Sequence, residues 1–208
     1  MYFEVFLVGL LAGISPGPDF VVVMKNSLSG GRGSGRGAAL GIATALIIHV
    51  SYTVLGFAVL LQHYPGLFHG IQLAGAAYLI FLGLQALRSR PAPPQTAPLA
   101  ETAAGTAPSG ISRGFRDGFL CNLLNPKAPL FYLSIFAQFL TPATPGWVRW
   151  IYGLETVVAV GGWFLFLATV ASSEHFRKVY VKSRHWFDRA LGLVLLYLAV
   201  RIIWSAIK

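Results

Sequence analysis

Two charged residues lie inside apolar stretches of the chain, each directly after a helix-breaking sequence. Asp19 follows Pro16-Gly17-Pro18 in the N-terminal stretch, and Lys127 follows Asn125-Pro126 in a later one. Breaking a helix in lipid exposes backbone groups that hydrocarbon cannot satisfy, at about several kcal/mol each. Such a break therefore requires protein or a water-filled cavity around it, and in transport proteins that place is usually the binding site.

The first break has two interpretations that can coexist. Pro18 suits the first position of a new half-helix and Asp19 its first turn. Asp19 could simply cap this half-helix. Alternatively, the positive end of the half-helix and its unpaired N–H groups could face a carboxylate-bearing substrate.

The second break places a cation where a helix disfavours it. Asn125 suits an N-cap and Pro126 a first helical position, so Lys127 falls in the first turn, against the helix dipole. Inserting a lysine at the bilayer centre adds a further cost of about 2.5–3.5 kcal/mol. It needs an anionic partner, either Asp19 or a substrate carboxylate, unless it reaches the membrane surface. Asn122, one turn earlier, could contribute polar contacts to the same cavity.

Two further ionisable residues, His49 and Glu155, lie inside other apolar stretches. Imidazole and carboxylate groups can take up and release protons when burial alters their affinity for them. We therefore regard Asp19, Glu155 and His49 as proton-coupling candidates. His49 could instead be a structural histidine that is hydrogen-bonded to a neighbouring helix.

The composition of these 208 residues is that of an all-α integral membrane protein, with 55% hydrophobic and only 11% charged residues. A net charge of +9 would suggest a nucleic-acid partner in a soluble protein. Here the basic residues fall in hydrophilic gaps, so we expect them to set membrane orientation, with no nucleic-acid partner. The single cysteine, Cys121, excludes an intrachain disulfide and a cysteine-built metal cluster. We expect no cofactor and no metal.

Apolar windows long enough to cross a bilayer predict six transmembrane helices, the first and fourth of them broken. The predicted spans are about 2–28, 38–61, 65–87, 114–140, 147–172 and 186–206. The glycine-rich segment 30–37 has no nucleotide-binding register, and we interpret it as a flexible basic turn.

The chain divides into two related halves, 1–87 and 114–208, joined by a Pro/Ala/Thr-rich segment, 88–113, with the composition of a flexible linker. Each half holds an odd number of spans, which predicts two inverted three-helix repeats. The excess of basic residues places loops one, three and five in the cytoplasm and both termini outside, in the periplasm.

Both breaks resemble signatures of the lysine exporter (LysE/RhtB) family. The first runs from Ser15 through Asp19 to Gly41, and the second from Gly118 through Lys127 to Phe139. The resemblance implies a bacterial inner-membrane exporter of amino acids or close derivatives, driven by the proton motive force and with no enzymatic activity. The Ser-Pro-Gly-Pro-Asp-Phe form is similar to the threonine and homoserine efflux branch.

The charges of the candidate residues suggest roles that would suit a zwitterionic substrate. Lys127 and the two half-helix N-termini would bind the substrate carboxylate. Asp19, with Glu155 as a second candidate, would receive the α-ammonium or the coupling proton. The partners would be an amino-acid substrate, protons and the lipid bilayer.

Other classes fit less well. A cation exporter of related inverted-repeat architecture would be expected to carry several intramembrane carboxylates where this chain has Lys127. A membrane thiol carrier needs a cysteine pair, and an enzyme needs a nucleophile with a base or a metal constellation. The compound exported, the proton stoichiometry, the choice between monomer and homo-oligomer, and the partner of Asp19 stay open.

Overall fold

The computed structural model describes residues 2–15, 17–89, 110–141, 143–171 and 173–207. Within these ranges every regular element is an α-helix. The eight helices are α1 (Tyr2–Ile14), α2 (Pro18–Ser29), α3 (Gly31–His63), α4 (Pro65–Leu87), α5 (Ile111–Leu123), α6 (Lys127–Phe139), α7 (Gly146–Val170) and α8 (Glu174–Ile207). The all-helical prediction is confirmed, and both predicted breaks appear as interruptions, between α1 and α2 and between α5 and α6.

Three of the helices are long and apolar enough to cross a membrane: α3, α4 and α7. The pair α1 and α2, bent by 59°, would make a fourth span if it is counted as one crossing. This search covered only the described residues and included no membrane. The apolar helices agree with a membrane protein, and the full set of six spans stays a prediction.

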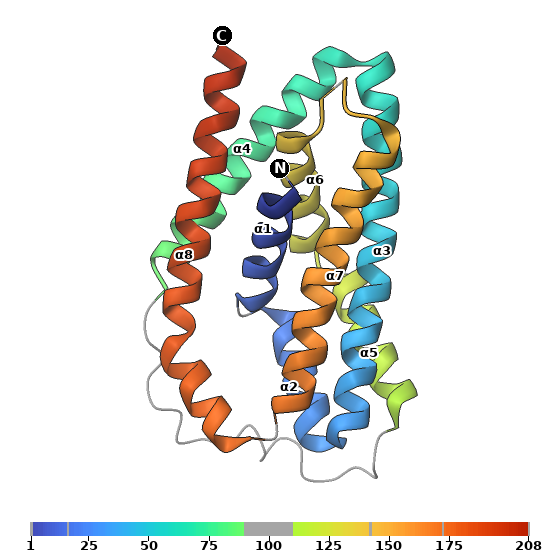
Figure 1. The fold of residues 1–208 in the computed structure, drawn as a ribbon, viewed down its shortest axis with the longest axis vertical. Helices are drawn as coiled ribbons and strands as arrows, with labels where there is room; N and C mark the ends of the chain where they lie inside the picture. Colours follow the sequence, from blue (N-terminus) through green and yellow to red (C-terminus); the bar gives the residue numbers. More distant parts are fainter. Residues whose placement is uncertain (1, 16, 90–109, 142, 172, 208) are drawn as a thin grey trace.

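The helices form an elongated bundle (Figure 1). Helix α2 ends, α3 begins, and α7 gives way to α8 at the lower end of the view, whereas the α3–α4 and α6–α7 connections lie at the upper end. The short helix α1 lies in the middle of the bundle against α7 and α8. Helices α1 and α2, which flank the first interruption, therefore lie against longer helices. At the second interruption Leu124 is exposed.

Glycines bring α3 and α5 into backbone contact. A Cβ at Gly37 or Gly41 of α3 would collide with backbone atoms of α5, and a Cβ at Gly114 or Gly118 of α5 would collide with backbone atoms of α3. Small residues that let two backbones approach closely are typical of helix packing in membranes.

This interface corrects one prediction. The glycine-rich segment 30–37 is not a flexible turn, because α3 begins at Gly31, well before the predicted start of the second span at residue 38. Two of its glycines are needed for close packing, Gly35 against Ser27 of α2 and Gly37 against Ile111 of α5. Composition alone could not distinguish a packing surface from a flexible connection.

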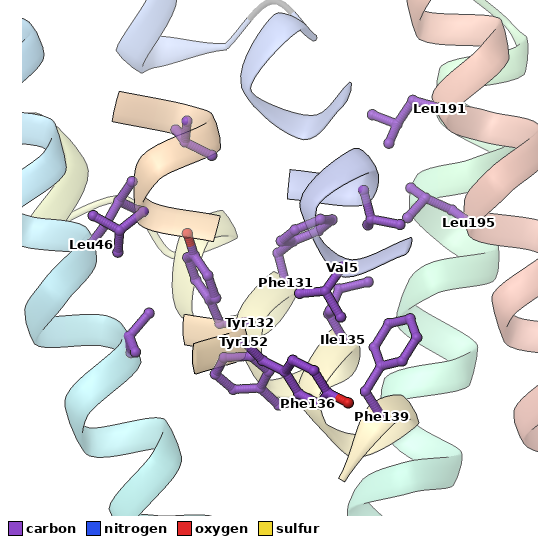
Figure 2. Close-up of a cluster of buried hydrophobic side chains, with 14 of the residues drawn as sticks. Val5, Leu46, Phe131, Tyr132, Ile135, Phe136, Phe139, Tyr152, Leu191 and Leu195 are labelled. Atoms are coloured by element: carbon purple, nitrogen blue, oxygen red, sulfur yellow. The ribbon is translucent and has the colours of Figure 1, made fainter. Parts of the chain in front are cut away.

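A cluster of buried side chains fills the interior beside the breaks (Figure 2). Aromatic residues of α6, Phe131, Phe136 and Phe139, gather there with Val5 of α1. Tyr152 of α7 lies against Phe139, with their ring centroids 6.4 Å apart. The cluster fixes α6 to its neighbours and so holds the second break in position.

The α3–α5 contact predicts a stability effect. Gly118→Ala should lower the free energy of unfolding by about 1–3 kcal/mol, because the added methyl group meets the backbone of Ala38 and neither helix can yield locally. Thermal unfolding of the purified protein in detergent measures the effect. Gly56→Ala is the matched control, since nothing lies within 4 Å of a Cβ at that position of α3. Equal unfolding midpoints for the two variants would contradict the proposed role of this interface.

Candidate functional site

At the first break, α1 ends at Ile14 and α2 begins at Pro18. Gly17 has extended backbone angles (φ −153°, ψ −173°) and precedes α2, where Pro18 takes the first position and Asp19 the next, as predicted. At the end of α1, the hydroxyl group of Tyr180 donates a 2.7 Å hydrogen bond to the carbonyl oxygen of Ile14. This bond satisfies one of the carbonyl groups that a helix end leaves unpaired. Pro16 lies outside the described residues.

The second break has a side-chain hydrogen bond. The Oδ1 atom of Asn125 accepts a 3.0 Å hydrogen bond from the backbone N–H of Lys127. Helix α6 begins at Lys127, so Pro126 takes the N-cap position that was predicted for Asn125, and that position has no side-chain cap bond. Asn125 instead binds the first helical N–H group from one residue before the cap, and the lysine lies at the very start of the helix.

One hydrogen bond joins the two breaks. The side-chain amide of Asn122, only 1% exposed, donates a 2.9 Å bond to Oδ2 of Asp19. Asp19 Oδ1 and Asn122 Oδ1 are buried and have no hydrogen-bond partner among the described residues. Buried polar atoms without partners are costly, so this pair has capacity for a bound group or a proton.

A small cavity of about 70 Å³ lies between the breaks. Ser15, Gly17, Pro18 and Asp19 line it from the first break. From the second half, Asn122, Asn125 and Lys127 line it, together with Tyr132. The structure thus brings together most of the residues that the sequence predicted for a binding site, although Pro126 is exposed and lies outside this lining.

A larger cavity of about 410 Å³ adjoins the first, and Ser15, Lys127 and Phe131 line both. This larger cavity extends to Arg88, which is exposed at the end of α4. Asp188 of α8 lines it as well. Lys127 therefore lies between two carboxylates, Asp19 in the small cavity and Asp188 in the larger one.

Lys127 forms no ion pair within 4.0 Å with either carboxylate in the part of the chain that the structure describes. It faces Asp19 in the small cavity and Asp188 in the larger one. A mostly buried ammonium group without a direct partner is costly. The arrangement leaves Lys127 available to an anionic ligand.

Asp188 was missed by the sequence analysis. Its side chain is 5% exposed, and its two oxygens accept hydrogen bonds from Ser15 (2.9 Å) and Ser89 (2.7 Å). In the sequence it follows Trp186 near the start of the sixth predicted span, within a basic segment. An acid near a span end is easily assigned to the membrane surface, and only the fold places it beside Ser15.

His49 lies behind the small cavity and is 2% exposed. Its Nε2 atom contacts the backbone carbonyl of Asn122 at 3.1 Å, and its Nδ1 atom contacts the hydroxyl of Tyr52 at 2.6 Å. Because a carbonyl only accepts, Nε2 carries the hydrogen in that contact. His49 thus supports the residue that binds Asp19, and it lines neither cavity.

Glu155 of α7 lines neither cavity either. Its Oε2 atom is buried and has no hydrogen-bond partner within the described ranges. The α7 residues that reach the small cavity are Val160 and Phe164, more than one turn further along the helix. The structure therefore does not bring Glu155 together with Asp19 and Lys127.

Apolar helices that are interrupted beside charged residues facing a shared cavity are typical of membrane transport proteins. The sequence profile of the LysE type translocator family matches residues 10–206. The chain belongs to this family.

Several relatives match nearly the whole chain. The threonine efflux protein of Salmonella typhimurium (strain LT2) is 29% identical over 206 residues, covering 99% of this chain and 98% of the relative. The threonine efflux protein of Escherichia coli (strain K12) is 28% identical over 208 residues, with the same two coverages. The uncharacterized membrane protein YahN of the same strain is 30% identical over 193 residues, or 93% of this chain and 84% of the relative. No solved structure matches the chain.

The bond between the two breaks can be tested by a double-mutant cycle. Asn122→Leu should lower the free energy of unfolding by about 1–3 kcal/mol, because it leaves the buried Asp19 carboxylate without its donor. In an Asp19→Ala background the same change should cost clearly less, since that bond is already absent. Chemical unfolding of the purified protein measures all four variants. Additive costs would contradict a direct coupling of the breaks.

Proposed function

We propose that this protein is a six-span secondary exporter of amino acids, of the threonine or homoserine type, driven by the proton motive force across the bacterial inner membrane. The observation that carries this proposal is the shared cavity, which Asp19 lines from one break and Lys127 from the other. A zwitterionic amino acid carries the two charges that complement such a pair. The relatives named threonine efflux proteins support the choice of substrate class.

The helix pairings support two inverted repeats. If α1 to α4 correspond to α5 to α8, the contact of α1 with α7 becomes the contact of α5 with α3, and both contacts are present. The contact of α2 with α7 likewise becomes that of α6 with α3, which is also present. The pairs α3–α7 and α4–α8 each map onto themselves. The correspondence centres on α3 and α7, which flank the two breaks.

Glycine spacing supports the same correspondence. Gly9 and Gly13 of α1 face Thr156 and Val160 of α7. The helix that corresponds to α1 is α5, whose Gly114 and Gly118 have the same spacing and face α3. The first broken helix of each half thus packs through small residues against the long helix of the other half.

Charge distribution supports an orientation. Lys25, Arg32 and Arg36 lie around the α2–α3 connection, at the lower end of the bundle in Figure 1. By the positive-inside rule this end would face the cytoplasm. The larger cavity extends to Arg88 at the end of α4, whose loop the same rule assigns to the cytoplasm. This conformation would then accept substrate from the inside.

Proton coupling would use the buried carboxylate between the breaks. Asp19 has one oxygen bound to Asn122 and one without a partner among the described residues, so it can accept a proton without losing its existing bond. Protonation from the outside would remove its negative charge from a cavity that Lys127 also lines, and so weaken the overall attraction of the site for a substrate ammonium group. Release to the outside would follow, and His49 behind Asn122 would modulate this step.

The function is tested by uptake of labelled threonine into inside-out vesicles, or by its efflux from preloaded cells, with an imposed pH gradient. Lys127→Met should reduce the rate of gradient-driven export about 10- to 100-fold, because a charge-assisted hydrogen bond to the substrate carboxylate contributes about 1.5–3 kcal/mol. Lys127→Arg should retain part of the activity, since it keeps the charge. Full export by Lys127→Met would contradict the proposed site.

A further inference from the structure

We infer that Asp188, and not Asp19, receives the ammonium group of the transported amino acid when it binds, while Lys127 receives its carboxylate. This inference rests on the proposed function and assigns separate tasks to the two carboxylates. The larger cavity becomes the substrate site, and the small cavity around Asp19 is left to the proton.

Cavity volumes separate the two carboxylates. The cavity beside Asp19, at about 70 Å³, is the smaller of the two. The cavity of about 410 Å³ beside Asp188 can enclose a whole amino acid. A substrate can therefore occupy the Asp188 side without any rearrangement of the breaks.

The charges around the larger cavity also favour Asp188. Lys127 and Asp188 both line this cavity and attract each other, yet they form no ion pair within 4.0 Å. A cation and an anion that face one cavity without touching are complementary to a zwitterion, whose two charges can bridge them. Arg88 is exposed at the end of the same cavity, and Asp188 is the only carboxylate among the described residues that line it.

The hydrogen bonds of Asp188 hold it in place and leave room for a ligand. Ser15 donates to Oδ1 and Ser89 donates to Oδ2. An ionised carboxylate has about four lone-pair sites, so each oxygen can accept a further bond from an ammonium group. Ser15 belongs to the first break and Ser89 follows α4, so an ammonium bound here contacts the junction of α8 with the first half of the chain.

The experiment is equilibrium binding to the purified full chain in lipid nanodiscs. The probes are labelled threonine and its hydroxy-acid analogue, in which a hydroxyl group replaces the ammonium. The wild-type protein should bind threonine at least about 10-fold more tightly than the analogue, the discrimination expected of one charge-assisted bond. Asp188→Asn should weaken threonine binding by a similar factor, leave the analogue unchanged and so abolish the discrimination.

Two variants serve as comparisons. Asp19→Asn should retain the preference for threonine in the binding assay, whereas a pH gradient should no longer drive threonine transport. Asp117→Asn, at a half-exposed carboxylate paired with Arg116 at 3.7 Å, is the matched control and should alter neither binding nor transport. Loss of discrimination in Asp19→Asn, with Asp188→Asn unaffected, would overturn the inference.

If Asp188→Asn does not fold, Ser15→Ala and Ser89→Ala test the same point. Each should reduce the threonine preference severalfold, because each releases one oxygen of Asp188 from its donor. An unchanged preference in both serine variants would overturn the inference. If the wild-type protein exports threonine while Asp188→Asn keeps its preference, only the inference fails. If the wild-type protein neither binds nor exports threonine, the proposed function fails with it.

Discussion

The structure depends on satisfying the backbone of two interrupted helices away from water. At the first interruption the carbonyl group of Ile14 is bound by Tyr180 from α8, and at the second the N–H group of Lys127 is bound by Asn125. Both interruptions lie against long helices that glycines allow to approach closely. Because the backbone is held by these contacts, the side chains of the breaks remain available to a ligand.

The chemistry follows from a lysine held between two carboxylates without contacting either. Asp19 is bound to Asn122 on one side, and Asp188 is held by two serines on the other. In a poorly screened interior a direct ion pair would be strong and would compete with a substrate. Because Lys127 is separated from both carboxylates, its ammonium group can bind the carboxylate of a substrate. In our account, one carboxylate binds the substrate and the other exchanges a proton.

Much of this arrangement could be predicted from sequence because membrane insertion restricts the choices. The positions of proline and asparagine residues predicted both breaks, and the lengths of the apolar stretches predicted α3, α4 and α7. The start of α3 was predicted wrongly, since glycine signals both flexibility and close packing. Asp188 was missed for another reason. Its place beside the cavity depends on hydrogen bonds from Ser15 and Ser89, which are distant from it in sequence. The separation of Glu155 from the cavity likewise depends on helix rotation, which periodicity alone did not determine.

The central claim is that the two breaks form one substrate site. Thiol labelling in a Cys121→Ser background tests it directly, with Ala12→Cys placed on α1 and Phe131→Cys on α6, both at positions that line the larger cavity. Ala77→Cys, at an exposed position of α4, is the control. The account predicts that threonine slows the labelling of both cavity positions and leaves the control unchanged. Protection of one cavity position alone, or of neither, would contradict a shared site.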